Sequence, residues 1–183
     1  MAVQTTYIRY FGPVDDERIK KLMAALDQEL KGGVDRFVVL ISSLGGSVFH
    51  GISAYNFLKG IPAEIVTHNF GSVDSIAVCL YCAGTKRFCV PHARFLIHGI
   101  GFDAPAGARF DEKLLSERIA NLKNERETIC SIIADNTGKK LEDVERDMFA
   151  GITLSAEQAK GYGLVQEIKP QLFEKQAQVI SIT

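Results

Sequence analysis

The sequence lacks an excess of either charge, since 21 Lys and Arg residues stand against 22 Asp and Glu residues in a chain of 183. A chain without an excess of positive charge is not expected to bind nucleic acid. It also lacks a run of about 18 apolar residues, which a membrane-spanning helix requires, and residues 1–10 lack the basic-then-apolar order of a signal peptide. We therefore expect a cytoplasmic protein that binds neither nucleic acid nor a membrane.

Cysteine is scarce, and its four positions are Cys79, Cys82, Cys89 and Cys130. The first two form a C-x-x-C pair inside an apolar stretch, and neither a second pair nor a histidine completes a zinc-binding set. Free cysteine is among the most buried of side chains. We interpret all four as reduced core residues, and we expect no metal or other cofactor.

Apolar runs and helical periodicity alternate along the chain. The composition, 46% hydrophobic and 23% charged, is that of a globular protein, and the length indicates one domain over residues 1–183. The alternation predicts an α/β fold with crossover connections. Strands are predicted at 6–11, 36–41, 63–68, 87–90, 95–97 and 164–168, and helices at 15–30, 47–58, 76–83, 110–136, 141–148 and 155–162.

Two glycine-bearing segments are predicted to be turns that follow a strand and open a helix. They are "SSLGGS" at 42–47 and "GSVDS" at 71–75. Glycine allows backbone N–H groups to approach a ligand closely, and a helix start offers unpaired donors, so either turn suits an oxyanion. A tight turn without a ligand is the alternative for Gly45 and Gly46, and a helix N-cap is the alternative for Ser75.

His98 gives Ser75 a possible partner, because it stands at the end of a predicted strand, where ligands collect in open α/β sheets. A serine hydroxyl is a poor nucleophile until a base removes its proton, and imidazole can do so near neutral pH. The remaining histidines lack such a setting and are interpreted as surface or packing residues; they are His50, His68 and His92.

Four motifs in one order resemble the ClpP family, the proteolytic subunit of ATP-dependent Clp protease. They are "ISSLGGSVFHGISAYNFL", "GSVDSIA", "AGTKRFCVPHARFLIHG" and "TGKKLEDVERD…LSAEQAKGYGLV", within a similarity that runs over about residues 7–168. The resemblance implies a single-domain α/β chain of the ClpP/crotonase-like fold, built of repeated β-β-α units. It implies a serine peptidase that hydrolyses unfolded or short polypeptides, with Ser75 as nucleophile and His98 as general base. It also implies an oxyanion hole formed by the backbone N–H groups of Gly46 and Ile76.

The third member of the family's catalytic triad is missing from its usual place. The family's aspartate stands four residues before the serine of the L-S-A segment, and this chain has Gly151 there. Three outcomes follow: a slow Ser–His dyad, a substitute carboxylate, or a catalytically inactive assembly or regulatory subunit. The candidate substitutes are Asp147, Asp74 and Asp103.

Two further departures concern partners. The family's segment ahead of the first core strand, which serves docking to a ring-shaped ATPase, has no counterpart here, so the resemblance does not carry ATPase docking over. The loop "GIGFDAPAGARF" at 99–110 replaces the family's Q-P after the histidine, so substrate preference is not carried over either.

The helix predicted at 110–136 bears a long apolar stripe, and the family uses this region where two rings meet. We therefore expect a homo-oligomer, a seven-membered ring or a pair of rings. The stripe consists of Leu114, Leu115, Ile119, Leu122, Ile129, Ile132 and Ile133.

Two other enzyme classes fit the sequence less well. An enzyme acting on CoA esters, from the wider crotonase superfamily, would have no clear use for Ser75 and His98. A signal-peptide peptidase of the Ser–Lys type is disfavoured because the sequence contains no transmembrane segment.

Overall fold

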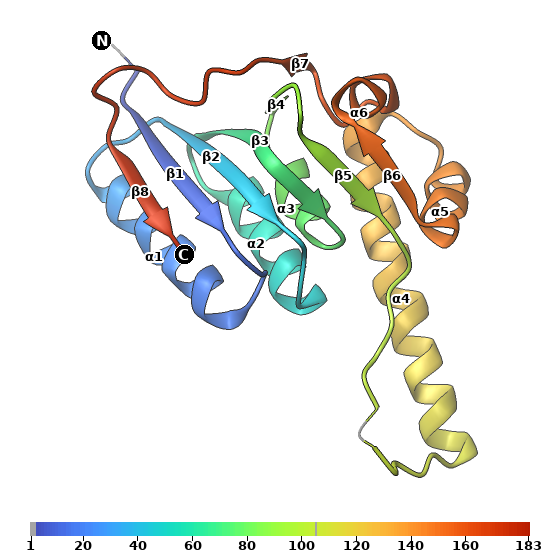
Figure 1. Cartoon of the computed structure of the whole chain (residues 1–183). Helices are drawn as coiled ribbons and strands as arrows, with labels where there is room; N and C mark the ends of the chain where they lie inside the picture. The colour runs from blue at the N-terminus through green and yellow to red at the C-terminus, as the bar shows by residue number, and fades with distance from the viewer. Residues whose placement is uncertain (1–2, 105) are drawn as a thin grey trace.

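The chain alternates strands and helices around one central sheet (Figure 1). The structure is a computed structural model that describes residues 3–104 and 106–183. The strands are β1 (Thr5–Phe11), β2 (Arg36–Ser43), β3 (Glu64–Asp74), β4 (Lys86–Cys89), β5 (Arg94–Ile97), β6 (Ile152–Ser155), β7 (Glu167–Ile168) and β8 (Val179–Ile182). The helices are α1 (Asp16–Lys31), α2 (Val48–Gly60), α3 (Ala77–Cys82), α4 (Glu112–Thr137), α5 (Leu141–Ala150) and α6 (Ala156–Tyr162).

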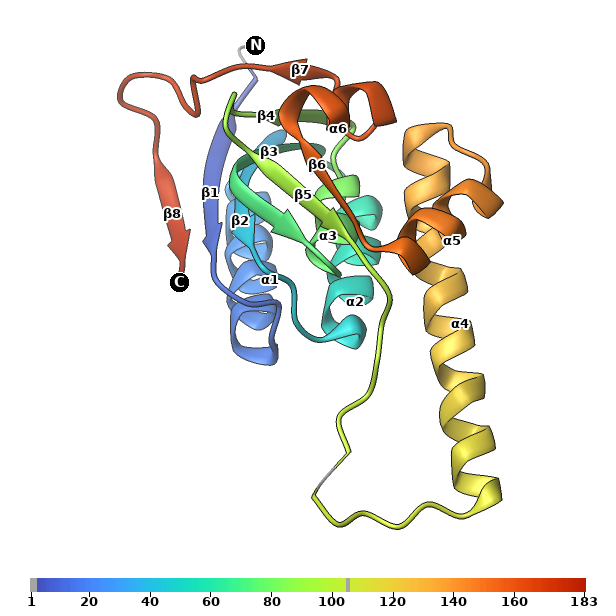
Figure 2. The ribbon, with the colours of Figure 1, turned by 45° about the vertical axis from the view of Figure 1, so that its right-hand side comes forward.

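The described strands form one eight-stranded sheet in the order β6-β5-β3-β2-β1-β8, with β4 joined to both β3 and β7. The paired strands run parallel, apart from the antiparallel pair of β5 and β6. Helices α1, α2 and α3 cover one face of the sheet, and α4 extends well past its edge (Figures 1 and 2). The predicted α/β class is confirmed.

Strand β2 shows why the run "RFVVLI" is apolar throughout. Phe37, Val39 and Ile41 point into the main core beneath the helices. Val38 and Leu40 point to the opposite face and join a second, smaller apolar cluster. Because successive side chains of a strand alternate between faces, a strand buried on both sides must be apolar at every position.

Side-chain caps fix the starts of four of the described helices, α1, α2, α4 and α6, close to the predicted positions. Asp15 precedes α1, and its carboxylate accepts a hydrogen bond from the backbone N–H of Arg18 at 2.9 Å. Ser155 and Gln158 form a reciprocal capping box at the start of α6. Such caps are local signals, because both partners lie within one helical turn.

The prediction of a turn at residues 71–75 is wrong. Strand β3 continues through Gly71 and ends only at Asp74. It changes partner on the way, pairing with β4 over Val66–Asn69 and with β5 over Ser72–Asp74. The second half of β3 is held by a strand some twenty residues away in sequence, so local composition did not indicate it.

Two strands were not predicted, and one was predicted too long. Strand β6 alternates but has only four residues, and β8 does not alternate; each is held by a distant partner, β5 for β6 and β1 for β8. The strand predicted at 164–168 is reduced to Glu167–Ile168, because the N–H of Leu164 donates to the carbonyl of Ala159 and closes α6 instead.

All four cysteines are buried and free, which confirms their placement in the core. Burial raises the pKa of Cys82 to about 12 and that of Cys130 to about 11, because a thiolate would lose its hydration there. No helix in the described part of the chain is long and apolar enough to cross a bilayer.

Candidate active site

Ser75 lies at a sharp corner between β3 and α3. Its φ is 58°, and the only other described residue besides glycine with a positive φ is Gln176. Residues other than glycine rarely adopt this conformation, and it recurs at functional sites where the surrounding structure enforces it. The backbone N–H of Ser75 donates to the carbonyl of Leu96 at 2.8 Å, which ties the corner to the neighbouring strand β5.

The helix does not use the Ser75 hydroxyl as its cap. Helix α3 begins at Ala77, its N-cap residue is Ile76, and no side chain caps it. The interpretation of Ser75 as a simple N-cap is therefore wrong. The side chain of Ser75 is half-buried and does not cap the helix. The backbone of Ser75 nevertheless adopts a positive φ, which is unfavourable for serine.

The Gly45–Gly46 pair lies directly against this corner. A Cβ atom on Gly45, whose φ is 94°, would stand 2.6 Å from Ser75 Cβ, and one on Gly46 would overlap the carbonyl oxygen of Val14. Val14 exchanges two backbone hydrogen bonds of 2.8 Å with the residues that flank Gly46, namely Gly45 and Ser47. In such a bridge, the N–H of the residue between them points away from the partner strand. Gly46 can therefore present its N–H outward.

His98 and Gly151 are neighbours in the structure. His98 follows β5 directly and is exposed. The antiparallel register pairs Ile97 with Ile152, so Gly151 comes opposite His98. A Cβ atom on Gly151 would stand 3.9 Å from His98 Cβ, an ordinary contact, and no other non-neighbouring atom lies within 4 Å of it. The position where the family resemblance places an aspartate is thus adjacent to His98 and open.

The candidate substitute carboxylates have other partners or lie in a loop. Asp147 accepts a hydrogen bond from the Tyr162 hydroxyl at 3.0 Å and lies 3.6 Å from an Arg146 nitrogen. Asp74 is buried and ion-paired with Arg94. Asp103 is exposed in the loop after His98; residue 105 of that loop lies outside the described residues. In the described part of the chain, none of the three carboxylates forms an ion pair with His98.

The ion pair of Asp74 and Arg94 was not anticipated from the sequence. Arg94 also donates to the Ser72 hydroxyl at 3.1 Å. It therefore joins the end of β3 to the start of β5, just ahead of Ser75. The sequence shows an aspartate directly before Ser75, which could have indicated an ion pair. Only the strand register identifies Arg94 as the partner of this buried acid.

An apolar groove of about 610 Å³ begins beside His98 and runs between α4 and α5. Its charged rim includes Lys123, Arg126 and Glu145. Such a groove can accept an apolar segment of an extended chain. Its apolar lining comprises Gly99, Ile100, Ile119, Leu122, Met148 and Phe149.

Comparison with known proteins gives one consistent family. The family model described as Clp protease matches residues 1–171. The ATP-dependent Clp protease proteolytic subunit 2 of Corynebacterium efficiens is 35% identical over 162 residues, which cover 85% of this chain and 77% of that protein. Proteolytic subunit 1 of Corynebacterium jeikeium is 33% identical over 162 residues, 85% of this chain and 82% of that protein. The solved structure of a ClpP1 mutant from Listeria monocytogenes superposes with a TM-score of 0.78 at 27% identity, covering 92% of each chain.

Proposed function

This chain belongs to the Clp protease family, and from that membership we propose that it is a slow serine peptidase acting on unfolded or short polypeptides, with Ser75 as nucleophile and His98 as general base. The observation that carries the proposal is the positive φ of Ser75, a strained corner that the helix cap does not explain. Strain of this kind persists where it positions a reacting group.

In the proposed reaction, His98 takes the proton of the Ser75 hydroxyl as its oxygen attacks the peptide carbonyl carbon. The carbonyl oxygen becomes negative and accepts hydrogen bonds from the N–H groups of Gly46 and Ile76. The imidazolium then gives its proton to the leaving amine, and water hydrolyses the acyl-enzyme in a second step. One oxyanion donor is worth about 10² to 10³ in rate.

The proposed slowness follows from the surroundings of His98. An orienting carboxylate holds the imidazole in the productive tautomer and stabilises its charged form. Gly151 supplies no side chain, and Asp147 and Asp74 are bound to other groups. The same observation favours the second candidate, a catalytically inactive subunit that serves assembly or regulation.

A fluorophosphonate probe distinguishes the two candidates, because it reports the nucleophilicity of a serine without requiring the right peptide. We expect labelling at Ser75, none in Ser75→Ala, and nearly none in His98→Ala. Ser53→Ala is the matched control, since Ser53 lies on α2 and its hydroxyl donates to the carbonyl of Phe49 one turn earlier in the same helix. Mass spectrometry of the labelled peptide gives the site. A folded protein that takes up no probe would leave the inactive-subunit candidate.

We further propose that copies of this chain assemble into a ring or a pair of rings through α4. The stripe on this helix divides in two: Ile129, Ile132 and Ile133 are buried in the core, whereas Leu115 and Ile119 are 41% and 49% exposed. Core packing therefore accounts for the second half of the helix only, and the first half extends past the sheet (Figure 2).

Assembly is tested by changing the exposed half of the stripe. We expect native mass spectrometry to find a homo-oligomer, and we expect Leu115→Glu to shift the population toward smaller species, because a charge in an apolar contact is desolvated without a partner. Leu141→Glu, an equally exposed leucine on α5, is the control. A wild-type protein that is monomeric at micromolar concentration would contradict this proposal.

A further inference from the structure

The face of the sheet that lies opposite α1, α2 and α3 has its own apolar surface. We call this surface the outer face; it is formed by Tyr7, Val38, Leu40, Val66 and Phe88. These side chains form a cluster separate from the main core. An apolar surface of this kind is unfavourable in water unless something covers it.

The chain covers the outer face with its own C-terminal segment. We call residues 170–178 the strap; it leads from β7 to β8 (Figure 2). Leu172 packs on the apolar cluster, and the ring of Phe173 meets that of Tyr7 edge-on with centroids 6.2 Å apart. Beyond the strap, β8 pairs with β1 alone, through four residues, and its Ile182 is buried in the main core.

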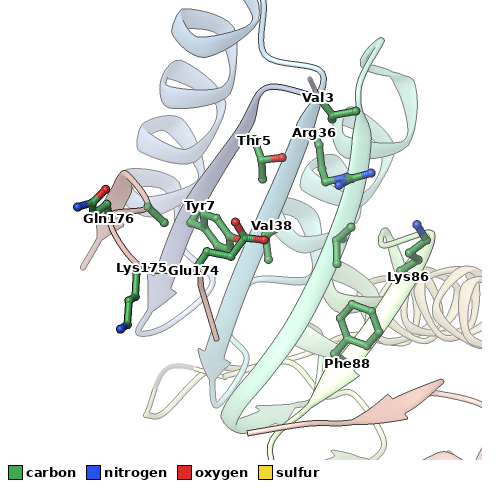
Figure 3. A pocket seen from close by; sticks show the side chains of 12 residues that line it. Val3, Thr5, Tyr7, Arg36, Val38, Lys86, Phe88, Glu174, Lys175 and Gln176 are labelled. Carbon is green, nitrogen blue, oxygen red and sulfur yellow. The ribbon is translucent and has the colours of Figure 1, made fainter. Parts of the chain in front are cut away.

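This cover fits loosely. Two pockets of about 680 and 220 Å³, both open to solvent, separate parts of the strap from the sheet. Figure 3 shows the larger one, with Tyr7, Val38 and Phe88 on the sheet side and Glu174 and Lys175 on the strap. Across these pockets the strap does not touch the sheet, so it lacks part of the packing contact that a closely seated segment would make.

Two further features of the strap agree with weak attachment. Gln176 has a φ of 65°, and Phe173 remains 46% exposed. Elements with few buried contacts and a strained backbone open at low free energy while the rest of a fold stays intact. The strap and β8 also lie almost wholly outside the part of the chain that matches the family model, which ends at residue 171.

We propose that the outer face binds the strap and β8 of a second copy of this chain, exchanging them with its own. The contacts available in trans are the same as those made in cis: Leu172 and Phe173 on the apolar cluster, and β8 beside β1 with Ile182 in the main core. Exchange of an identical element needs no new complementary surface and is opposed mainly by the opening of the closed form. When each copy donates to the next, a head-to-tail contact of this type closes into a ring if the rotation permits.

Single cysteines on the two exchanging strands test the proposal in the full-length protein. Arg9 on β1 and Ser181 on β8 are register partners, both are exposed, and the guanidinium donates to the hydroxyl at 2.8 Å. The native cysteines are buried, so they do not interfere. When folded Arg9→Cys and Ser181→Cys proteins are mixed under mild oxidation, we expect a mixed disulfide dimer to accumulate.

Two controls make the outcome decisive. Arg9→Cys mixed with Lys160→Cys, an exposed position on α6, measures random collision. Adding Leu172→Ala to the Ser181→Cys chain removes an anchor, and we expect the mixed disulfide to form about tenfold faster. Leu141→Ala, at an exposed leucine on α5, should leave the rate unchanged when it is made in the same chain. A mixed disulfide that forms no faster than the collision control, or that does not respond to Leu172→Ala, would overturn the exchange.

Discussion

Replacing Gly151 with aspartate is expected to raise the rate of peptide hydrolysis by about 10² to 10⁴, the upper figure being what a triad aspartate contributes in other serine proteases. The new Cβ would stand 3.9 Å from His98 Cβ with no closer obstacle, so a carboxylate there can reach the imidazole. It would hold the ring in one tautomer and stabilise the imidazolium. Hydrolysis of a short unstructured peptide and fluorophosphonate labelling at Ser75 measure the gain.

The backbone at Gly151 limits the gain. Its φ of 73° and ψ of 68° place it in the left-handed region, where a side chain other than glycine costs about 1 to 2 kcal/mol. Aspartate and asparagine tolerate this region better than other residues do. Helix α5 therefore need not rearrange, and we expect the variant to fold with a somewhat lower free energy of unfolding.

Two matched variants separate charge from backbone strain. Gly151→Asn has nearly the same shape and the same backbone penalty but no negative charge, so it should leave hydrolysis low. Gly138→Asp places the same side chain on another left-handed C-cap glycine, at the end of α4, where φ is also 73° and no atom lies near the new Cβ. Equal rates for Gly151→Asp and Gly151→Asn, with both proteins folded, would mean that a missing carboxylate at His98 is not what limits the site.

Replacing Gly45 with alanine is expected to abolish most labelling of Ser75 and to lower the free energy of unfolding by about 2 to 4 kcal/mol, from overpacking and left-handed strain together. The added Cβ would stand 2.6 Å from Ser75 Cβ and 2.9 Å from the carbonyl oxygen of Asp74. Either the glycine loop or the serine corner must move. A displacement of about 1 Å in a catalytic group can cost about 10² in rate.

The control for this substitution is Gly161→Ala. Gly161 lies inside α6, has no positive φ, and has open space where its Cβ would be. Alanine favours a helix more than glycine does, so this variant should be as stable as the wild type or slightly more so. Chemical denaturation and probe labelling on both variants check the pair. Full labelling of a folded Gly45→Ala protein would show that the loop does not hold Ser75 in place.

Both substitutions depend on neighbours that only the folded chain brings together. The motif "SSLGGS" contains Gly45 and Gly46, and the motif "GSVDS" ends at Ser75. Neither motif indicates that Gly45 lies against Ser75. Their contact arises because β2 and β3 are parallel neighbours whose ends meet at one edge of the sheet. Likewise, Gly151 and His98 stand more than fifty residues apart and become neighbours through the antiparallel pairing of β5 and β6.

The sequence by itself determined the helices, the strands β1 and β2, the buried cysteines and the family, because each depends on local periodicity, caps or an ordered set of motifs. Only the tertiary structure decided the second half of β3, the corner at Ser75, the open position beside His98 and the covering of the outer face by the strap and β8. These features depend on which distant strand becomes a neighbour. Partner choice is a property of the whole packed sheet, whereas periodicity records only whether a side chain is buried.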